Sequence, residues 1–468
     1  MYLKKFIKEF KRQVVPNRIT YISSICFLLL FLSTMNVWAG TIFEFHPFFT
    51  PEAVYNDNIF TTRSDTRSDW ITTLSPGFIT SLLHPRFNYT LEYRPGIVYY
   101  LHHPENDYTS QEVNFKGIIE LTPRLTLSLY KHYIRSINSL VTELEETDYE
   151  RSLRRRTLIM FNRNIISSQM KYRFGRDNLI SLYYRNTNYR SGDPLEDDYV
   201  ESYCKSEMEY WFNVRNALNL KTHFTKGNFD FTNTDLLYSV DITVRYIRRF
   251  TPHFDLYGEY GAGVADFEER RYFMSLDRRR EVQVDSQDVE DYDLRKFNLG
   301  FEWQLPQNFH IEGSIGYFWR SGKGSRDDQG ITSLFEIDKS LEDLTLSLTW
   351  ESGYSASYFA VRDSGFTEFW RIKTDLTYNY HDILEFKCRG SYGYREYTYG
   401  RGTGSAITKR EDYRYTYNIS LNYHILRNYG LLRKLSLELQ FNHAELDSSV
   451  DYNYYITNQF TANITATF

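Results

Sequence analysis

Apolar and polar side chains alternate strictly along many short segments of this chain. In residues 344–351 (LTLSLTWE) every even position is apolar, and in residues 435–442 (LSLELQFN) every odd position is apolar. A period of two places successive side chains on opposite faces of an extended strand, so the pattern predicts β-strands with one apolar face. A soluble β-sandwich would show the same alternation, and only the connections between the segments distinguish the two.

Short and long connections alternate along the chain. Nine short connections are rich in Pro, Gly, Asn and Asp, the residues that tight turns require. This asymmetry is typical of transmembrane antiparallel up-and-down β-barrels, which have short periplasmic turns and longer outside loops. We therefore expect an all-β barrel of about 18–20 strands, with 20 if residues 42–60 contain the first. The ten longer, more charged connections are 61–69, 102–109, 137–161, 190–198, 232–235, 268–290, 321–329, 358–365, 399–410 and 447–452.

The aromatic content fits this class. Aromatic residues make up 18% of the 468 residues, with 41 Tyr, 34 Phe and 7 Trp. Disordered chains are poor in aromatics, and a helical membrane protein with several spans would need more than the one long apolar run found here. Transmembrane barrels carry such rings in girdles at both membrane interfaces. The residues expected in these girdles are Trp303, Trp319, Trp350 and Tyr423.

Residues 1–39 have the organisation of a secretory signal peptide. A basic stretch precedes an apolar run at 22–32, and Val37 and Ala39 are the small residues expected just before a cleavage site. An uncleaved anchor helix is the alternative, but the run is short for a span of about 20 residues. We therefore expect one barrel domain over residues 40–468.

The last segment alternates in the same way and ends on an aromatic residue. Ile456, Phe460, Ile464 and Phe468 share its apolar register. A terminal Phe468 after such a strand resembles the recognition signal of the outer-membrane barrel assembly machinery, which we expect as a partner. An ordinary edge strand that happens to end there is the alternative.

The polar register of the clearer strands is expected to face the barrel interior, because Arg or Lys on the lipid face near the midplane costs about 2–4 kcal/mol. Acidic residues outnumber basic ones in this set, which predicts an aqueous and modestly cation-preferring passage. The rings of Tyr130, Tyr203, Trp211 and Tyr257 lie on the same register and offer surfaces for sugars. The alternative is that these charges pair across neighbouring strands and brace the wall. The predicted inward charges are Glu207, Glu209, Asp241, Asp255, Glu259, Glu302, Glu312, Glu351, Glu385, Glu438, Lys205, Lys221, Arg245, Lys387 and Arg389.

Linear motifs of catalytic centres are missing from the sequence. It contains no nucleophile elbow, HExxH, P-loop or GxGxxG in a strand–helix setting. His132, His223 and His310 fall on the inward register but are isolated in sequence, and Cys204 and Cys388 are predicted to be free thiols. We therefore expect no enzyme activity, no cofactor and no metal site.

Two predicted loops are strongly charged. Residues 149–156 contain four arginines, and residues 268–290 mix arginines with acidic residues. Contact with phosphates of outer-leaflet lipopolysaccharide or with an anionic polymer is one interpretation, and solvated loops neutralised by their own acids is the other. The formal net charge of -5 and the lack of a recognised module give no support for nucleic-acid binding.

The most specific motif follows the expected signal peptide. It comprises residues 47–60 (PFFTPEAVYNDNIF), 68–71 (SDWI) and 74–78 (LSPGF). These residues resemble the family known as β-barrel porin 2, over about 32 residues of the chain. Many members look like outer-membrane proteins of exopolysaccharide loci, so the resemblance implies a role with a polysaccharide and carries over no catalytic residue. The motif positions are Tyr55, Asp57, Asn58, Phe60, Pro76 and Gly77.

The motif also has a physical interpretation. Its Pro-Gly step at Pro76 falls nearly opposite a second one at Pro95 if the turn between them centres on Pro85. Proline cannot donate to a strand ladder, so a paired kink is predicted there. We expect Asp57 and Asn58 to cap freed backbone groups at the barrel rim, and we favour this structural role over ligand binding.

The pattern as a whole predicts a channel in the outer membrane of a Gram-negative bacterium, since eighteen or more strands enclose an aqueous lumen. Our leading hypothesis is passive export of an exopolysaccharide, gated by loops or by a periplasmic polysaccharide-export partner. A general or substrate-selective diffusion porin is the alternative, with residues 137–161 or 268–290 folded inward as a constriction. An outer-membrane enzyme on lipid or polymer is a second alternative. A barrel sheathing a multihaem conduit would need a cytochrome partner, of which this chain shows no trace.

Overall fold

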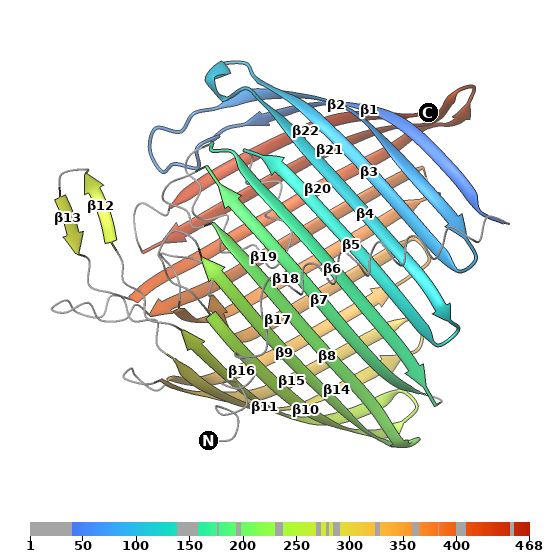
Figure 1. Cartoon of the computed structure of the whole chain (residues 1–468), viewed down its shortest axis with the longest axis vertical. Helices are drawn as coiled ribbons and strands as arrows, with labels where there is room; N and C mark the ends of the chain where they lie inside the picture. Colours follow the sequence, from blue (N-terminus) through green and yellow to red (C-terminus); the bar gives the residue numbers. More distant parts are fainter. Residues whose placement is uncertain are drawn as a thin grey trace.

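The structure, a computed structural model, is a closed barrel of tilted antiparallel strands (Figure 1). The expected signal peptide at residues 1–39 lies outside the described residues, so its boundary stays a prediction. Within the described residues, no helix is both long and apolar enough to span a membrane. The structure describes residues 40–137, 158–175, 177–192, 198–229, 237–267, 273–277, 280–283, 291–322, 328–357, 365–381, 383–398, 409–449 and 454–468.

One sheet of 20 strands forms the barrel, which confirms the all-β barrel class and the higher strand count. The short strands β12 (Phe273–Asp277) and β13 (Arg280–Gln283) form a separate two-stranded sheet, and η1 (Pro104–Asn106) is one 3-10 turn. The barrel strands are β1 (Ile42–Asn56), β2 (Asp69–His84), β3 (Phe87–Tyr100), β4 (Tyr108–Thr122), β5 (Leu125–Ser136), β6 (Phe161–Phe174), β7 (Asn178–Ser191), β8 (Tyr199–Asn213), β9 (Asn216–Phe229), β10 (Leu237–Thr251), β11 (Phe254–Phe267), β14 (Tyr292–Leu305), β15 (Phe309–Gly322), β16 (Asp328–Ser340), β17 (Leu344–Ser357), β18 (Gly365–Tyr380), β19 (Leu384–Thr398), β20 (Lys409–Tyr429), β21 (Leu432–Ser448) and β22 (Tyr455–Thr467).

The nine predicted short turns each join two consecutive barrel strands. Between β8 and β9, Asn213 Oδ1 accepts a hydrogen bond of 2.9 Å from the amide of Arg215. Gly175 and Gly430 take positive φ values of 62° and 59° in two other turns. Side-chain capping and left-handed residues thus let the chain reverse within two or three residues.

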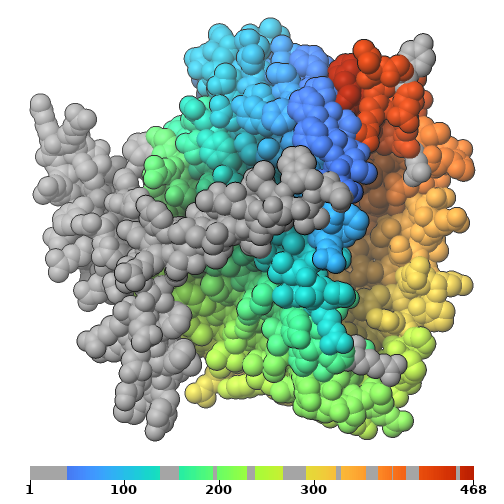
Figure 2. All heavy atoms as spheres, turned by 45° about the vertical axis from the view of Figure 1, so that its right-hand side comes forward, coloured from blue at the N-terminus to red at the C-terminus, as the bar shows by residue number. Residues whose placement is uncertain are grey.

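β1 closes the barrel by pairing with both β2 and β22. Phe48 lies opposite Thr467 at one end of the β1–β22 seam, and Asn56 lies opposite Gln459 at the other. Figure 2 shows the blue N-terminal strands beside the red C-terminal strands. Since the first and last barrel strands pair, the described sheet has no open edge.

The strand registers sort the side chains into an inner and an outer face, because directly paired residues point to the same side. Side chains of strands that are not neighbours meet on the concave face, as Arg245 of β10 and Glu302 of β14 do. That face is therefore the inside of the barrel. Large apolar and aromatic side chains populate the other face, and they include the four expected girdle residues Trp303, Trp319, Trp350 and Tyr423.

Apolar packing continues across neighbouring strands on the outer face. Phe87, Tyr89 and Ile119 bury one another between β3 and β4. Near the seam, an apolar hollow of about 540 Å³ is lined mainly by outward residues of five strands, among them Leu439 and Phe460. The outside of the barrel thus presents an apolar surface.

The two Pro-Gly steps lie where the sequence predicts them. β2 and β3 pair up to Leu74 opposite Ile97 and again from Phe78 opposite Tyr93. The same register places Pro76 opposite Pro95 within this gap. The ladder is interrupted there because neither proline has an amide hydrogen to donate.

Gly77 lies where the inner wall leaves no room for a side chain. A Cβ atom at this position would lie 2.4 Å from Phe48 Cζ and 2.6 Å from the carbonyl oxygen of Tyr93, whereas at outward Gly258 the nearest atom lies at 3.6 Å. We expect Gly77→Ala to lower the free energy of unfolding by about 1–3 kcal/mol through overpacking. Urea titration of the folded band on a gel that separates folded from unfolded barrel would measure it. An equal loss in the matched variant Gly258→Ala would contradict the explanation.

Candidate functional site

The inner wall carries every charged residue that the sequence analysis assigned to it. Their registers are continuous from β8 through β15 and again from β17 through β21. Placement on the inner face follows from these registers. Their part in lining a passage stays a prediction.

Arg245 joins three strands of the inner wall. Its Nε lies 3.0 Å from Glu259 Oε2 on β11, and its Nη1 lies 3.4 Å from Glu302 Oε1 on β14. Lys296 Nζ is a second cation, 3.4 Å from Glu259. The side chain of Glu259 is only 8% exposed, so its charge depends on these two partners.

A second group centres on Glu207 of β8. The Nζ atoms of Lys205 and Lys221 each lie 3.6 Å from its carboxylate. On the same strand, Trp211 Nε1 donates a hydrogen bond of 2.7 Å to Glu209. The alternative interpretation of the inward charges, that they pair and brace the wall, therefore describes this part of the barrel.

The β17–β19 region is ion-paired and open to solvent. The guanidinium of Arg371 contacts Glu351, and Arg389 Nε lies 2.9 Å from Asp375 Oδ1. The side chains of Arg389 and Asp375 are 53% and 49% exposed although both face inward. Water must therefore reach this part of the barrel interior.

The balance of inward charge differs from the sequence prediction. The residues read from the clearer strands gave an acidic excess. The registers add further inward acids, such as Glu201, Asp328 and Asp375, together with many inward lysines and arginines. Most come from β6, β7 and the region from β18 to β20, where the sequence alternation is less clear. The inner wall is therefore close to balanced, with Lys387 paired to Glu385 at 2.7 Å as a typical case. The added basic residues include Arg163, Lys171, Arg173, Arg185, Lys296, Arg320, Arg371, Lys373, Arg395 and Arg414.

Arginine guanidiniums cover most of the inward rings that were considered as sugar surfaces. Arg249 lies 4.1 Å from the ring centroid of Trp211, and Arg245 lies 4.0 Å from that of Tyr257. Tyr203 has a guanidinium 5.3 Å away. A sugar would have to displace these cations to stack on the covered faces.

An apolar cluster lies on the inner wall at the long-loop end of β1, β2 and β3. Val54, Ile71 and Val98 are buried there with Tyr100. Ile137, Leu158 and Met160 pack against it from the two ends of the 137–161 connection. Both ends of this long loop are thus held on the barrel interior. Residues 138–157 lie outside the described residues, and so does most of 268–290, so a constriction by either loop stays a prediction.

The three inward histidines have different surroundings. His132 Nε2 lies 3.4 Å from Glu112, and His223 is paired in register with Lys205 and with Asp241. His310 Nδ1 lies 3.7 Å from Asp338 Oδ2 on the adjacent strand. This last pairing is not visible in the sequence, because Glu336 and Asp338 become informative only once β15 is aligned beside β16.

The motif residues Asp57 and Asn58 bind the last strand to the first. Asp57 accepts hydrogen bonds of 2.7 and 2.6 Å from the backbone amide and Nδ2 of Asn458. Asn58 Nδ2 donates to the carbonyl oxygens of Ile456 and Thr62, each at 2.8 Å. Asn58 is 1% exposed, so these contacts satisfy a buried amide. This agrees with the expected capping role at the rim.

Two other motif positions make ring contacts outside the β1–β22 seam. The ring of Tyr55 lies 5.2 Å from that of Trp70, and Phe60 meets the ring of His103 at 6.0 Å. At the opposite end, the amide of Phe468 donates a hydrogen bond of 2.9 Å to the carbonyl oxygen of Pro47. Asp57 and Asn58 of the motif and the terminal Phe468 therefore hold opposite ends of the β1–β22 seam.

Comparisons with known proteins find likeness at the level of the barrel. No family model matches the chain, so the resemblance to β-barrel porin 2 stays a prediction. No curated protein matches either. The chain is similar to OpdK, an outer-membrane protein of Pseudomonas aeruginosa, with a TM-score of 0.37 and 12% identity over 91% of this chain and 99% of that one.

Two other solved structures give similar values. OccAB3 of Acinetobacter baumannii has a TM-score of 0.36 and 11% identity, over 91% of this chain and 99% of that chain. The ferric enterobactin receptor PfeA of Pseudomonas aeruginosa has a TM-score of 0.46 and 11% identity, over 91% and 81%. Likenesses this distant carry no argument about function.

The architecture itself decides the location of the protein. Closed antiparallel barrels with an apolar outside and a polar inside span the outer membrane of Gram-negative bacteria, because closure satisfies every strand within the bilayer. This barrel has an apolar outer face and a polar inner face, and it is closed by the pairing of β1 with β22. This chain is an outer-membrane β-barrel.

Asp57 gives a direct test of the seam. We expect Asp57→Ala to destabilise the folded barrel by about 1–3 kcal/mol, since the amide and side chain of Asn458 lose their acceptor. The fraction of folded protein after urea treatment would measure the loss. Glu105→Ala is the matched control, because that acidic side chain is exposed on the 3-10 turn η1, where a surface substitution changes stability little. Equal stability of the two variants would contradict the role of Asp57.

Proposed function

We propose that this barrel is a passive diffusion channel for small hydrophilic solutes. The observation that carries the proposal is the solvent-exposed, ion-paired inner wall, seen best at Asp375 and Arg389. Barrels of 16–18 strands leave an aqueous channel, and this one has 20. A wall of paired charges keeps water and polar solutes inside without presenting a binding surface for apolar molecules.

The charge pattern also supports weak ion selectivity. Glu351, Glu259 and Glu207 each have at least two cationic neighbours within 4 Å. Because acidic and basic residues are interspersed around the wall, they create no large field of one sign. We therefore propose a channel that passes both cations and anions.

Export of an exopolysaccharide is the second candidate. It is favoured by the motif at residues 55–60, which resembles a family found in exopolysaccharide loci. It would require a periplasmic export partner and a lumen wide enough for a hydrated polymer. The guanidiniums over Trp211 and Tyr257 count against ring stacking as its mechanism. The described residues give no support to an outer-membrane enzyme, because no nucleophile, base and orienting acid lie together among them.

Single-channel conductance of the refolded protein in a planar bilayer tests the proposal. We expect stable currents with a cation-to-anion permeability ratio within about threefold of unity, because the wall is nearly balanced. An acidic exopolysaccharide added to one side distinguishes the two candidates. An unaffected current supports the diffusion channel, whereas block by the polymer supports export. No current from protein shown to be folded would overturn both.

Thiol accessibility tests whether the inner wall lines the conducting path. The native Cys204 and Cys388 are free and lie on the outer face. The response of the unsubstituted protein to the reagent therefore gives the baseline for the cysteine variants. We expect a membrane-impermeant cationic thiosulfonate to reduce the current through Asp375→Cys. The adjacent variant Thr374→Cys, which points outward, should conduct as before. Equal responses of the two variants would exclude the inner wall as the path.

A further inference from the structure

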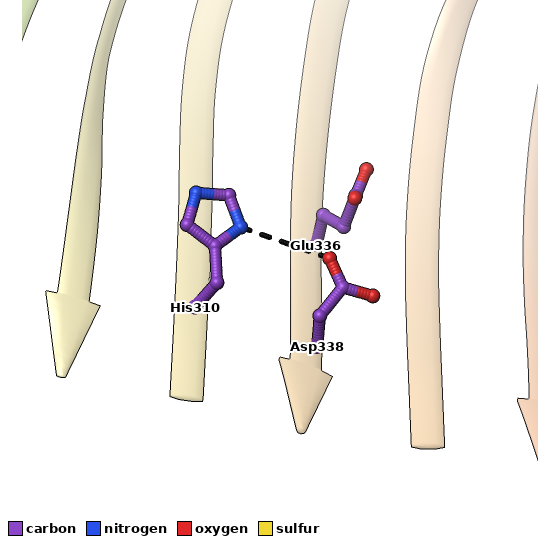
Figure 3. Close-up of side chains that lie close together, drawn as sticks. All are labelled: His310, Glu336 and Asp338. Carbon is purple, nitrogen blue, oxygen red and sulfur yellow. Dashed lines mark ion pairs between the residues drawn. The ribbon is translucent and has the colours of Figure 1, made fainter. Parts of the chain in front are cut away.

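Three chelating side chains meet on the inner wall near the short-turn end of the barrel. They are His310 on β15 and Glu336 and Asp338 on β16, and their ligand atoms all lie within 4.8 Å of one another. Figure 3 shows the imidazole directed toward β16 and the Asp338 carboxylate turned toward it, with 3.7 Å between Nδ1 and Oδ2. Glu336 projects from the same face two residues earlier.

The electrostatic surroundings of this cluster form a second, independent observation. Asp255, Glu302, Glu312 and Glu336 lie directly opposite one another on four successive strands. Like charges in directly opposed positions destabilise a sheet. A cation placed at the end of this row would relieve the repulsion.

Arginines neutralise only one half of the row. Arg249 binds Asp255 through two hydrogen bonds of 3.0 and 3.1 Å, and Arg245 reaches Glu302. Glu312 accepts a hydrogen bond of 3.0 Å from the neutral hydroxyl of Tyr257. Among the residues that the structure describes, no lysine or arginine lies within ion-pair distance of Glu312 or Glu336.

We propose that His310, Glu336 and Asp338 bind a divalent first-row transition-metal ion of the zinc type. One imidazole nitrogen with two carboxylates is a donor set that Zn²⁺ accepts in tetrahedral geometry, with a fourth position left for water. Mg²⁺ and Ca²⁺ prefer six or more oxygen ligands, and imidazole favours transition metals over them.

The geometry suits this ion. Ligand atoms at about 2.0–2.2 Å from a tetrahedral metal lie roughly 3.3–3.6 Å apart, so rotation about side-chain torsions suffices to bring the three groups into place. Both strands are paired on each side of the cluster, which fixes the three Cα positions. His310 and Asp338 are 32% and 38% exposed, so the ion can enter from the barrel interior.

Bound metal would add positive charge to the most acidic part of the inner wall. It would neutralise the carboxylate of Glu336 by direct contact and lower the repulsion at Glu312 through its positive charge. Arg249 and Arg245 do the same for Asp255 and Glu302. The site is a binding property of two strands and holds whether or not the barrel conducts. Its test is therefore separate from the conductance experiments.

Cobalt(II) binding to the tag-free, refolded full-length barrel tests the proposal, because tetrahedral Co²⁺ absorbs visible light. We expect one bound ion per chain, displaced by Zn²⁺ and retained in millimolar Ca²⁺ and Mg²⁺. In His310→Ala and Glu336→Gln the dissociation constant should rise at least tenfold. The control His132→Ala should bind as the unsubstituted protein does, since among the described residues Glu112 is the one acid within ion-pair distance of His132.

Three results would overturn the proposal. These are the lack of a Co²⁺ spectrum, binding that the two substitutions leave unchanged, and displacement by Ca²⁺. Glu336→Gln is nearly isosteric and removes one of the opposed charges, so we expect it to fold. Folding of each variant is checked by the shift of the folded band on a gel. If His310→Ala does not fold, His310→Gln takes its place.

Discussion

The structure depends on the pairing of its first and last strands. In a bilayer each backbone amide and carbonyl that lacks a partner costs several kcal/mol, so a sheet can span only when it has no edge. Here the edge is removed where β1 meets β22, and Asp57, Asn58 and Asn458 hold the long-loop end of that seam. The amide of Phe468 holds the other end by bonding to Pro47. Every other strand pair is joined by a local hairpin or loop, whereas this one must be made across the whole length of the chain.

Closure separates two environments and sets the chemistry of each. The outer face is selected for apolar contact, as in the packing of Phe87, Tyr89 and Ile119. The inner face holds its charges because arginine and glutamate on adjacent strands lie opposite each other, as Arg245 and Glu259 do. Such pairs keep the wall polar without a large net field. The acidic row that ends at Glu336 departs from this balance, and for that reason it stands out as a candidate metal site.

Much of the barrel could be predicted from local patterns. Alternation has a period of two in any strand, and tight turns need Pro, Gly, Asn or Asp, so the short turns, the strand number and the inward position of Glu207 or Glu351 followed from the chain itself. The opposition of Pro76 and Pro95 followed as well, because one hairpin turn sets that register. The inward charge balance was misjudged where strands such as β6 alternate weakly and carry Arg163, Lys171 and Arg173 inside.

Local sequence by itself thus determined the class of fold, the turns and the face on which each residue lies in strands of clear alternation. These features depend on backbone geometry over a few residues. Only the tertiary structure decided which strands became neighbours across long loops and across the seam. That choice brought Asp57 to Asn458, which are 401 residues apart, and His310 to Asp338 across one strand pair. Contacts of this kind depend on the register between separate strands. Register in turn depends on the closure of the whole barrel, which no segment of the sequence specifies alone.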